Sequence, residues 1–270
     1  MKVFVMGLLL LCGMAHGKST NITIYSDSYN NNMISPQDLA GVLFEDVVKN
    51  VQDEFNVTFQ NSSMKREWVA LSQSDNVCLY NKRRTAEREQ MGSFGKYPLL
   101  AFPPNRLITH ADAQIPESVS LVATVDKWNL TIGIASGRSY GKRLDQAINK
   151  LPEHNVVMVE GSSASIRLRE MMKTKRIDAF IEFWPTIVSV YPEEEARQLY
   201  NLHELIEATD FIFGHVVCSD SPLGDRFITR INEEMGKPSF FEKVLRGHRN
   251  EMPREEYARI REALRTAYLQ

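Results

Sequence analysis

A stretch with four cationic side chains, "NVCLYNKRRTAEREQM" at residues 76–91, follows a short apolar run. The cations are Lys82, Arg83, Arg84 and Arg88. A guanidinium group pairs with a carboxylate through two parallel hydrogen bonds, and this pairing is strong where water is excluded. The stretch could therefore hold an anion. Alternatively, the first three cations are solvated or attract anions from solution, and Arg88 forms an ion pair with Glu87 or another neighbour.

Other residue types that do chemistry show no useful spacing. The six histidines are scattered along the chain, at His16, His110, His154, His203, His215 and His248. The sequence has no Gly-x-Ser-x-Gly nucleophile motif and no complete phosphate-binding loop. We therefore expect no metal site and no cofactor, and nothing in the sequence demands an enzyme.

The composition is that of an ordinary globular protein preceded by an export signal. Of 270 residues, 43% are apolar and 24% are charged, which suffices for one large core or two smaller ones. The net charge of −2 argues against a nucleic-acid-binding surface. Met1–Lys2, an apolar run over 3–14 and the small residues before residue 18 are typical of a signal peptide. We expect cleavage after Gly17 and a soluble, exported product.

The elements that must position the cationic stretch alternate between strands and helices. Strands are predicted over residues 21–26, 55–59, 77–80, 130–135, 155–159, 177–181 and 211–218. Helices are predicted to begin at Ser35–Pro36 and Ser221–Pro222, and to cover 64–71, 144–148, 164–174 and 254–269. This alternation favours parallel α/β sheets. Two such units fit the length, and the segment after residue 218 is too short to form a third.

Two cysteines, Cys78 and Cys218, remain after removal of the signal peptide. In an oxidising compartment they suggest one disulfide, and two buried free thiols are the alternative. The residues alone leave both possibilities open.

Five motifs follow the export signal in a set order: "ITIYSDSY", a strand followed by "TAERE", "GIASGRSYG", "MMKTKRIDAFI" and "GHVVCSDSPLGDRFITRINEEM". Their order and spacing resemble the bacterial extracellular solute-binding proteins of family 3, of the type that binds polar amino acids. The resemblance implies a type II periplasmic-binding fold, an α/β architecture of two lobes. Each lobe is a mostly parallel sheet flanked by helices, and two crossing hinge strands join the lobes around the ligand. Lobe one would be residues 18–109 plus 214–270, and lobe two residues 110–213, with crossings near 106–111 and 211–217.

The resemblance also implies which residues of lobe one bind the ligand. In amino-acid-binding members, a Thr-x-x-Arg motif after the third strand directs its arginine to the ligand α-carboxylate. "TAER" matches this motif and gives Thr85 and Arg88. Tyr29 and Asn30 stand where an aromatic wall is expected after the first strand, although the Pro-Pro-Phe common there is absent.

In lobe two, backbone amides at helix starts are expected to favour an anion. Ser139 and Tyr140 match that family position, and Arg138 stands beside them. Ser162 and Ser163 open a second helix in the same way, or are plain N-caps.

An acidic residue expected in lobe two is displaced by one position. Members that bind α-amino acids carry an aspartate just past the "RIDA" strand, where it takes the ligand ammonium. Here Phe183 occupies that position and Glu182 precedes it. Either Glu182 takes the ammonium, or the ligand is not an ordinary amino acid.

Together these features predict a monomeric periplasmic protein that closes around a small anionic or zwitterionic, amino-acid-like ligand. Its partner would be an ABC transporter or a sensor. One alternative is an enzyme on the same fold, similar to cyclohexadienyl dehydratases, with Glu182 as its acid–base group. Another is an interaction protein without a ligand. In this fold the strand returning from lobe two lies beside the third strand of lobe one, so the resemblance implies a Cys78–Cys218 disulfide.

Overall fold

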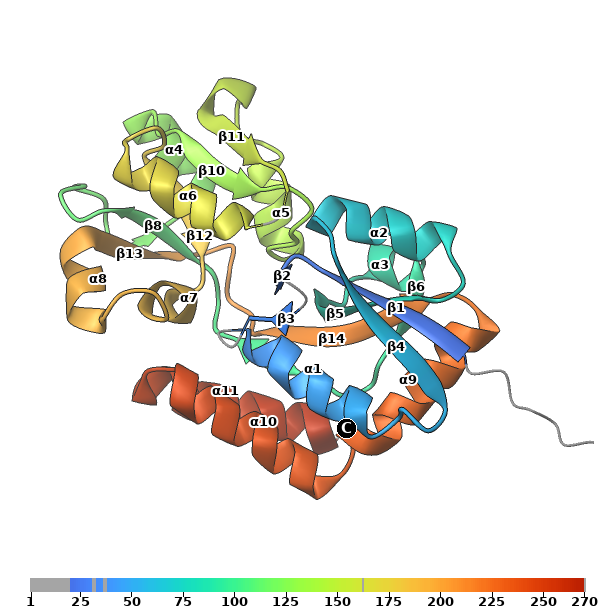
Figure 1. Cartoon of the computed structure of the whole chain (residues 1–270). Coiled ribbons are helices and arrows are strands. Elements are labelled where there is room, and N and C mark those ends of the chain that lie inside the picture. The colour runs from blue at the N-terminus through green and yellow to red at the C-terminus, as the bar shows by residue number, and fades with distance from the viewer. Residues whose placement is uncertain (1–19, 31–32, 36–37, 162, 270) are drawn as a thin grey trace, which may run out of the picture.

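The computed structural model describes residues 20–30, 33–35, 38–161 and 163–269. The expected signal peptide, residues 1–17, lies outside these ranges. Two six-stranded β-sheets, each with its own helices, lie beside one another (Figure 1). We call the unit around the first sheet lobe one and the unit around the second sheet lobe two. Within the described ranges, no helix is long and apolar enough to cross a membrane.

The sheet of lobe one has the strand order β4-β1-β5-β14-β6, with β7 also paired to β14. Its strands are β1 (Thr20–Ser26), β4 (Phe55–Asn61), β5 (Val77–Arg83), β6 (Gly92–Phe94), β7 (Leu100–Phe102) and β14 (Ile212–Ser219). Its helices are α1 (Leu39–Lys49), α2 (Met64–Gln73), α3 (Ala86–Glu89), α9 (Pro222–Met235), α10 (Pro238–Glu251) and α11 (Arg254–Leu269). A hairpin of β2 (Tyr29–Asn30) and β3 (Met33–Ile34) follows β1. Strands β1, β4 and β5 run parallel, and β14 returns antiparallel to β5.

Both faces of this sheet are covered by helices, and β5 shows how the sequence allows this. Cys78 and Tyr80 belong to the core shared with α1, α9, α10 and α11, whereas Val77 and Leu79 pack with Trp68 of α2. Successive strand residues face opposite sides of a sheet. A strand buried on both faces therefore needs the uninterrupted apolar run that the sequence has here. In Figure 1, α1, α10 and α11 lie on one side of the sheet and α2 on the other.

The sheet of lobe two has the strand order β11-β10-β12-β8-β13-β9. Its strands are β8 (Arg106–His110), β9 (Ser118–Val119), β10 (Ile132–Ala135), β11 (Val156–Val159), β12 (Ala179–Glu182) and β13 (Tyr200–Leu205). Its helices are α4 (Leu121–Trp128), α5 (Lys142–Ile148), α6 (Ala164–Lys173), α7 (Trp184–Val188) and α8 (Glu193–Leu199), with a 3-10 turn at Glu153–Asn155. Strands β10, β11 and β12 run parallel, and β8 lies antiparallel between β12 and β13.

The chain crosses between the sheets at residues 103–105 and 206–211, a few residues earlier than expected. The expected boundary between residues 109 and 110 falls inside β8, which pairs with β12 from Arg106 onward and therefore belongs to lobe two. Similarly, β14 pairs with β7 from Ile212, so the return to lobe one is complete there. Each crossing is thus anchored at both ends by a strand ladder.

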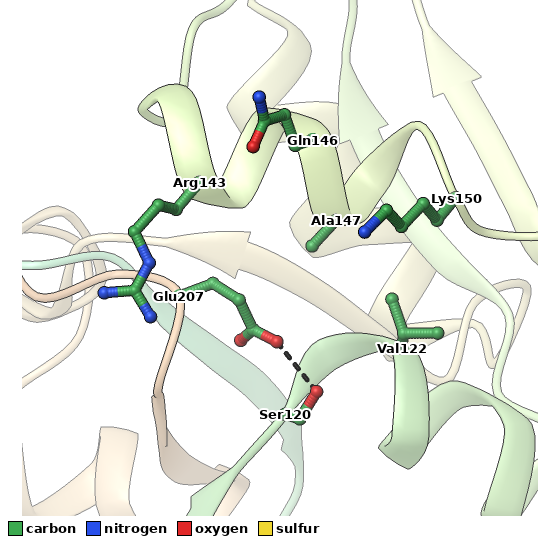
Figure 2. A pocket seen from close by; sticks show the side chains of 7 residues that line it. All are labelled: Ser120, Val122, Arg143, Gln146, Ala147, Lys150 and Glu207. Atoms are coloured by element: carbon green, nitrogen blue, oxygen red, sulfur yellow. Dashed lines mark hydrogen bonds between the residues drawn. The ribbon is translucent and has the colours of Figure 1, made fainter.

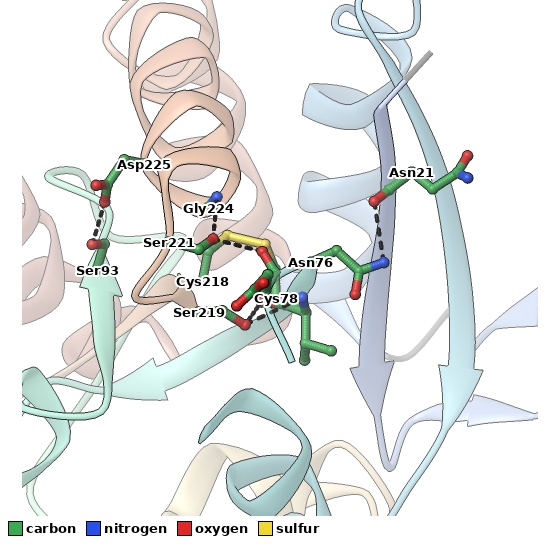
Figure 3. The surroundings of a disulfide bond; sticks show 11 residues. Asn21, Asn76, Cys78, Ser93, Cys218, Ser219, Ser221, Gly224 and Asp225 are labelled. Carbon is green, nitrogen blue, oxygen red and sulfur yellow. Dashed lines mark hydrogen bonds between the residues drawn. A yellow bond between two sulfur atoms is a disulfide. The ribbon is translucent and has the colours of Figure 1, made fainter. Parts of the chain in front are cut away.

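The disulfide expected between Cys78 and Cys218 is present (Figure 3). The two residues are direct partners across the β5–β14 ladder, and their Cα atoms lie 4.0 Å apart. Ser219, the next residue of β14, binds the backbone of Val77 on β5 through its hydroxyl group. The ladder register therefore places the two sulfur atoms on the same face of the sheet.

The start of α1 differs from the prediction. The helix begins at Leu39, and the side chain of Asp38 caps it by accepting from the Gly41 N–H at 3.1 Å. Both Ser and Asp are good N-caps, and the sequence analysis chose Ser35 because a proline follows it.

Candidate ligand-binding site

The side chain of Arg88, in lobe one, reaches across to lobe two. The side chain of Thr85 caps α3 by accepting from the Arg88 N–H at 3.3 Å, which fixes the backbone of this arginine. Its Nη1 donates to the Arg83 carbonyl at 3.2 Å, and its Nη2 donates to the Gly137 carbonyl of lobe two at 3.0 Å. The guanidinium carbon lies 4.4 Å from the centre of the Trp68 ring.

The Arg88 guanidinium has neutral partners. Among the described residues no carboxylate lies within ion-pair distance of it, Glu87 included. Burial lowers the pKa of Arg88 to about 10, so the group stays charged at neutral pH. Hydrogen bonds from a cation are stronger when the acceptor is an anion. Arg88 is therefore equipped to exchange the Gly137 carbonyl for a carboxylate.

The other three cations of the stretch have separate surroundings, and only one of them is solvated. Lys82 pairs with the buried carboxylate of Glu67 at 2.5 Å. Burial raises the pKa of Glu67, and the charge of Lys82 opposes that rise. Arg84 is exposed and pairs with Glu89. Arg83 is half-buried at the junction of the lobes. Solvation was one of two expectations for these cations, and it is wrong for Lys82, whose side chain is 12% exposed. The other expectation, that they attract anions from solution, stays a prediction.

The turn before α5 in lobe two is occupied by the chain's own carboxylate. Asp145 accepts from the Ser139 hydroxyl at 2.8 Å, from the Tyr140 N–H at 2.7 Å and from the Gly141 N–H at 3.3 Å. The Tyr140 hydroxyl accepts from the Ala135 N–H at 3.0 Å, so this ring is part of the core. Ser139 and Tyr140, expected to bind the ligand, are therefore engaged within lobe two.

The carboxylate of Glu182 is also bound by a residue of its own lobe, Arg138. Arg138 donates to its two carboxylate oxygens at 2.9 and 2.6 Å, and the Phe183 N–H donates to it at 2.9 Å. Only 1% of the Glu182 side chain and 16% of the Arg138 side chain are exposed. Burial alone would raise the pKa of Glu182, but the charge and hydrogen bonds of Arg138 outweigh burial and lower it. The carboxyl group of Glu182 is thus ionised, and Arg138 balances its charge.

Phe183, at the position where an aspartate was expected, joins the lobes through an apolar contact. Its ring stacks on that of Phe102 in lobe one, with centres 4.5 Å apart and planes 14° apart. The Arg138 guanidinium lies over the rings of Phe183 and Tyr140, with its carbon 4.8 Å from the centre of the first and 5.1 Å from the centre of the second. Lys65 of lobe one also pairs with Glu160 of lobe two at 3.3 Å. The lobes are therefore in direct contact.

Asp27 is a candidate that the sequence analysis missed. It follows β1 directly, at the carboxyl end of a parallel strand, where ligands of open α/β sheets bind. Its negative charge acts on Glu67 and Asp38 within lobe one and on Arg138 across the interface. No ion pair is formed by Asp27 with any described residue. An acidic residue immediately after the first strand was the signal that could have identified it.

Comparison with known proteins identifies the fold. No model of a known protein family matches the sequence, and no curated protein matches it. Solved structures do match. An arginine transport-system periplasmic binding protein from Legionella pneumophila has a TM-score of 0.62 at 17% identity, over 87% of this chain and 100% of that one. The arginine-, lysine-, histidine-binding protein ArtJ of Geobacillus stearothermophilus has 0.63 at 13%, over 89% and 100%. A structure from work on glutathione import via GshT of Streptococcus mutans has 0.67 at 12%, over 88% and 99%.

The chain has the two-lobed fold of the periplasmic amino-acid-binding proteins. This confirms the predicted α/β architecture, and the low identities leave the ligand to be argued from the chain's own residues.

The remaining candidates are Tyr29, Asn30, Ser162 and Ser163, and their contact with a ligand stays a prediction. Tyr29 lies in β2, with its ring centre 5.8 Å from that of Phe59 on β4 of the same lobe. Asn30 is its neighbour in β2. Ser163 precedes α6 with a left-handed φ of 62° and makes no capping hydrogen bond through its side chain. Ser162 lies outside the described residues.

Proposed function

We propose that the protein captures a small anionic or zwitterionic, amino-acid-like solute between its lobes in the periplasm. It would act as a monomer and deliver the solute to an ABC transporter or a sensor. The observation that carries this proposal is Arg88, a half-buried cation between the lobes that lies over Trp68 and whose hydrogen-bond acceptors among the described residues are neutral carbonyls. The fold supports it, since the matching structures include binding proteins for amino acids.

Binding would proceed by exchange of contacts at the interface. When the lobes part, Arg88 loses the Gly137 carbonyl and Phe102 separates from Phe183. A ligand carboxylate then replaces the carbonyl on Arg88, with its apolar part against Trp68. Asp27, on the same lobe, is the group available for a ligand ammonium. The lobes close again because neither lobe alone buries a small molecule well.

The structure disfavours the enzyme alternative through Glu182. A general acid or base needs a proton that it can give or take near neutral pH. Glu182 is held ionised by Arg138, with a lowered pKa. Because Glu182 was the acid–base group of the enzyme alternative, we propose a binding protein without catalytic activity.

A ligand screen followed by calorimetry tests this function. The chain from residue 18, purified without refolding, is first analysed by native mass spectrometry for a co-purified molecule. Amino acids and small carboxylates are then screened by thermal shift. Replacing Arg88 by Ala should weaken binding of the ligand found by about 2–5 kcal/mol, as for other buried charge pairs. The matched control is Arg84→Ala, which removes an exposed arginine four residues away. Equal affinities for the two variants would remove Arg88 from the site.

A further inference from the structure

Four polar side chains gather at the carboxyl-terminal end of α6 in lobe two, and we call them the α6 cluster. Arg169 and Lys173 are four residues apart on α6, so their side chains lie on the same face of the helix. Lys173 Nζ lies 5.1 Å from the ring centre of Tyr191, and the ring centres of Tyr191 and Tyr200 are 6.1 Å apart. The positive charges of Arg169 and Lys173 both act on the Tyr200 hydroxyl. Two cations and two phenols therefore share one small region.

Arg169 is a buried cation without a partner among the described residues. Only 7% of the residue is exposed, and its side chain forms neither a hydrogen bond nor an ion pair with a described residue. Buried charges are usually paired. Some buried polar atoms of the chain lack both a partner and contact with solvent, but the guanidinium nitrogens of Arg169 are not among them. Solvent therefore reaches the guanidinium, and a dissolved anion can approach it from the same side.

The other three side chains of the α6 cluster supply a second charge and two hydroxyl donors. Lys173 pairs with Glu170 at 3.3 Å, and 43% and 61% of the two side chains are exposed. Such exposed pairs contribute little and are easily exchanged. A hydrogen bond with Tyr191 raises the pKa of Lys173. Burial raises the pKa of Tyr200 to about 12, against the charges of Lys173 and Arg169, so this phenol keeps its proton at neutral pH and can donate it in a hydrogen bond.

The α6 cluster lies at the end of lobe two away from the interlobe contact. Strand β12 ends at Glu182, beside that contact, where it pairs with Arg106 of β8. Tyr200 pairs with His110, at the other end of β8. Four residues of strand separate the two ends, which is about 13 Å along β8. In Figure 1, α8, which immediately precedes Tyr200, lies at the edge of lobe two farthest from the sheet of lobe one.

A hollow elsewhere on lobe two, between α4 and α5, also contains cations, but they are exposed (Figure 2). Its volume is about 330 Å³, and Arg143 and Lys150 line it together with Glu207. Glu207 accepts from the Ser120 hydroxyl at 2.7 Å, and Arg143 donates to the Ile206 carbonyl at 2.9 Å. This hollow thus holds a carboxylate of its own, whereas the buried guanidinium of the α6 cluster has none.

We propose that the α6 cluster binds a divalent tetrahedral oxyanion, a phosphate or sulfate group, at a site separate from the cleft. The charges of Arg169 and Lys173 balance the two charges of the anion. The donors come from α6, from the turn before α8 and from the start of β13, so they approach from several directions. A tetrahedral anion offers oxygens in several directions, whereas a carboxylate offers two oxygens in one plane. Because the occupant bridges α6 and β13, it stabilises lobe two.

The test titrates the isotope-labelled chain from residue 18 with inorganic phosphate, sulfate, glycerol 3-phosphate and acetate, followed by NMR at constant ionic strength. Inorganic phosphate and glycerol 3-phosphate distinguish a free anion from a phosphate ester, and acetate is a planar anion with a single charge. We expect at least one divalent anion to shift the amides of Arg169, Lys173 and Tyr200 and to bind about fivefold or more tightly than acetate, the worth of one hydrogen bond. Arg169→Gln should weaken that binding about tenfold or more, because hydrogen bonds from a cation to an anion are the stronger kind.

Three further variants keep the result decisive. Arg167→Gln removes an exposed arginine two residues away on the same helix and should leave binding unchanged. Lys173→Gln changes an exposed side chain, so it remains informative even if Arg169→Gln fails to fold, and it should weaken binding about fivefold. Glu170→Gln removes the carboxylate that competes for Lys173 and should strengthen binding a few-fold.

The proposal is overturned by any of three results. These are that no divalent anion shifts the cluster amides at millimolar concentration, that acetate binds as tightly as the divalent anions, or that Arg167→Gln weakens binding as much as Lys173→Gln. Because the readout lies at the outer end of lobe two, it does not depend on the cleft ligand.

Discussion

Replacing Glu182 by Gln should destabilise the protein severely. Gln keeps the shape of the side chain and an acceptor for the Phe183 N–H, but it removes the charge that Arg138 pairs with. Arg138 would then be a cation with 16% of its side chain exposed, enclosed by aromatic rings and without an anion. Breaking a buried ion pair from one side costs about 3–5 kcal/mol. Because Gln can still accept one hydrogen bond, we expect a loss of about 3 kcal/mol at pH 7.

Removing both partners should restore most of that loss. In the double variant Arg138→Met/Glu182→Gln, neither charge of the pair remains, and the methionine takes the place of the guanidinium against the rings of Phe183 and Tyr140. Replacing a buried pair by groups of similar volume is often neutral or stabilising. The double variant should therefore be more stable than Glu182→Gln, with a coupling energy of about 2 kcal/mol or more.

Urea unfolding with linear extrapolation measures these differences, provided that the m-values stay equal. The pH dependence gives a second check. The folded-state pKa of Glu182 lies below its unfolded value, so the pair contributes stability above the unfolded pKa of about 4.3. That contribution is lost as pH falls through the folded pKa, and the gap between wild type and Glu182→Gln should narrow below pH 4. A cost under about 1 kcal/mol at pH 7, against the 3–5 expected of a buried pair, would refute the reasoning.

Three other predictions follow from single features. Thiol titration of the denatured, unreduced chain should find Cys78 and Cys218 oxidised, and the double Ser variant should lose about 5 kcal/mol on the chain-entropy model for a separation of 140 residues; two free thiols would contradict the bridge. Burial lowers the pKa of His215 to about 4, so the unfolded chain protonates first and stability should fall as pH drops from about 6.5 to 4; His215→Gln should flatten that slope in acid unfolding. Gly137 has a φ of +81°, and an added Cβ would lie 3.1 Å from the Lys65 backbone nitrogen of the opposite lobe; small-angle scattering of Gly137→Ala should show a larger radius of gyration than wild type, and identical curves would count against the closed contact.

The fold could be predicted because it rests on patterns that are local in sequence. Apolar runs such as Val77–Tyr80 identify strands buried on both faces, and the order of strands and helices restricts the topology. The Cys78–Cys218 pairing followed from the topology once the returning strand was placed beside β5. The crossings were misplaced by a few residues because their positions were taken from the resemblance, although Pro103 and Pro104, which do not continue a strand, mark the first crossing in the sequence.

For the site, the sequence offered a motif but not the partners of the charged groups. Arg88 was expected at the ligand because "TAER" matches the Thr-x-x-Arg motif of the family that the chain resembles, and its contact with a ligand stays a prediction. Glu182 and Arg138 are 44 residues apart. No local pattern around either residue indicates that the two will form an ion pair. The same applies to Asp145. Its carboxylate accepts hydrogen bonds from the amides and the hydroxyl group of a turn that was expected to bind an anion. Asp27 was missed because the resemblance pointed to an aromatic wall at Tyr29, two positions later.

The charged groups at the interface differ between the two lobes, because those of lobe two have partners and those of lobe one do not have ion-pair partners among the described residues. In lobe two, the carboxylates of Glu182 and Asp145 are satisfied by Arg138 and by the turn before α5. In lobe one, Arg88 and Asp27 have no described ion-pair partners. A ligand would therefore be recognised mainly by lobe one, and lobe two would act as a neutral cover whose contribution is burial. If the proposed function holds, selectivity would come from the spacing of Arg88 and Asp27, and affinity would depend on how readily the Phe102–Phe183 contact re-forms when the lobes close.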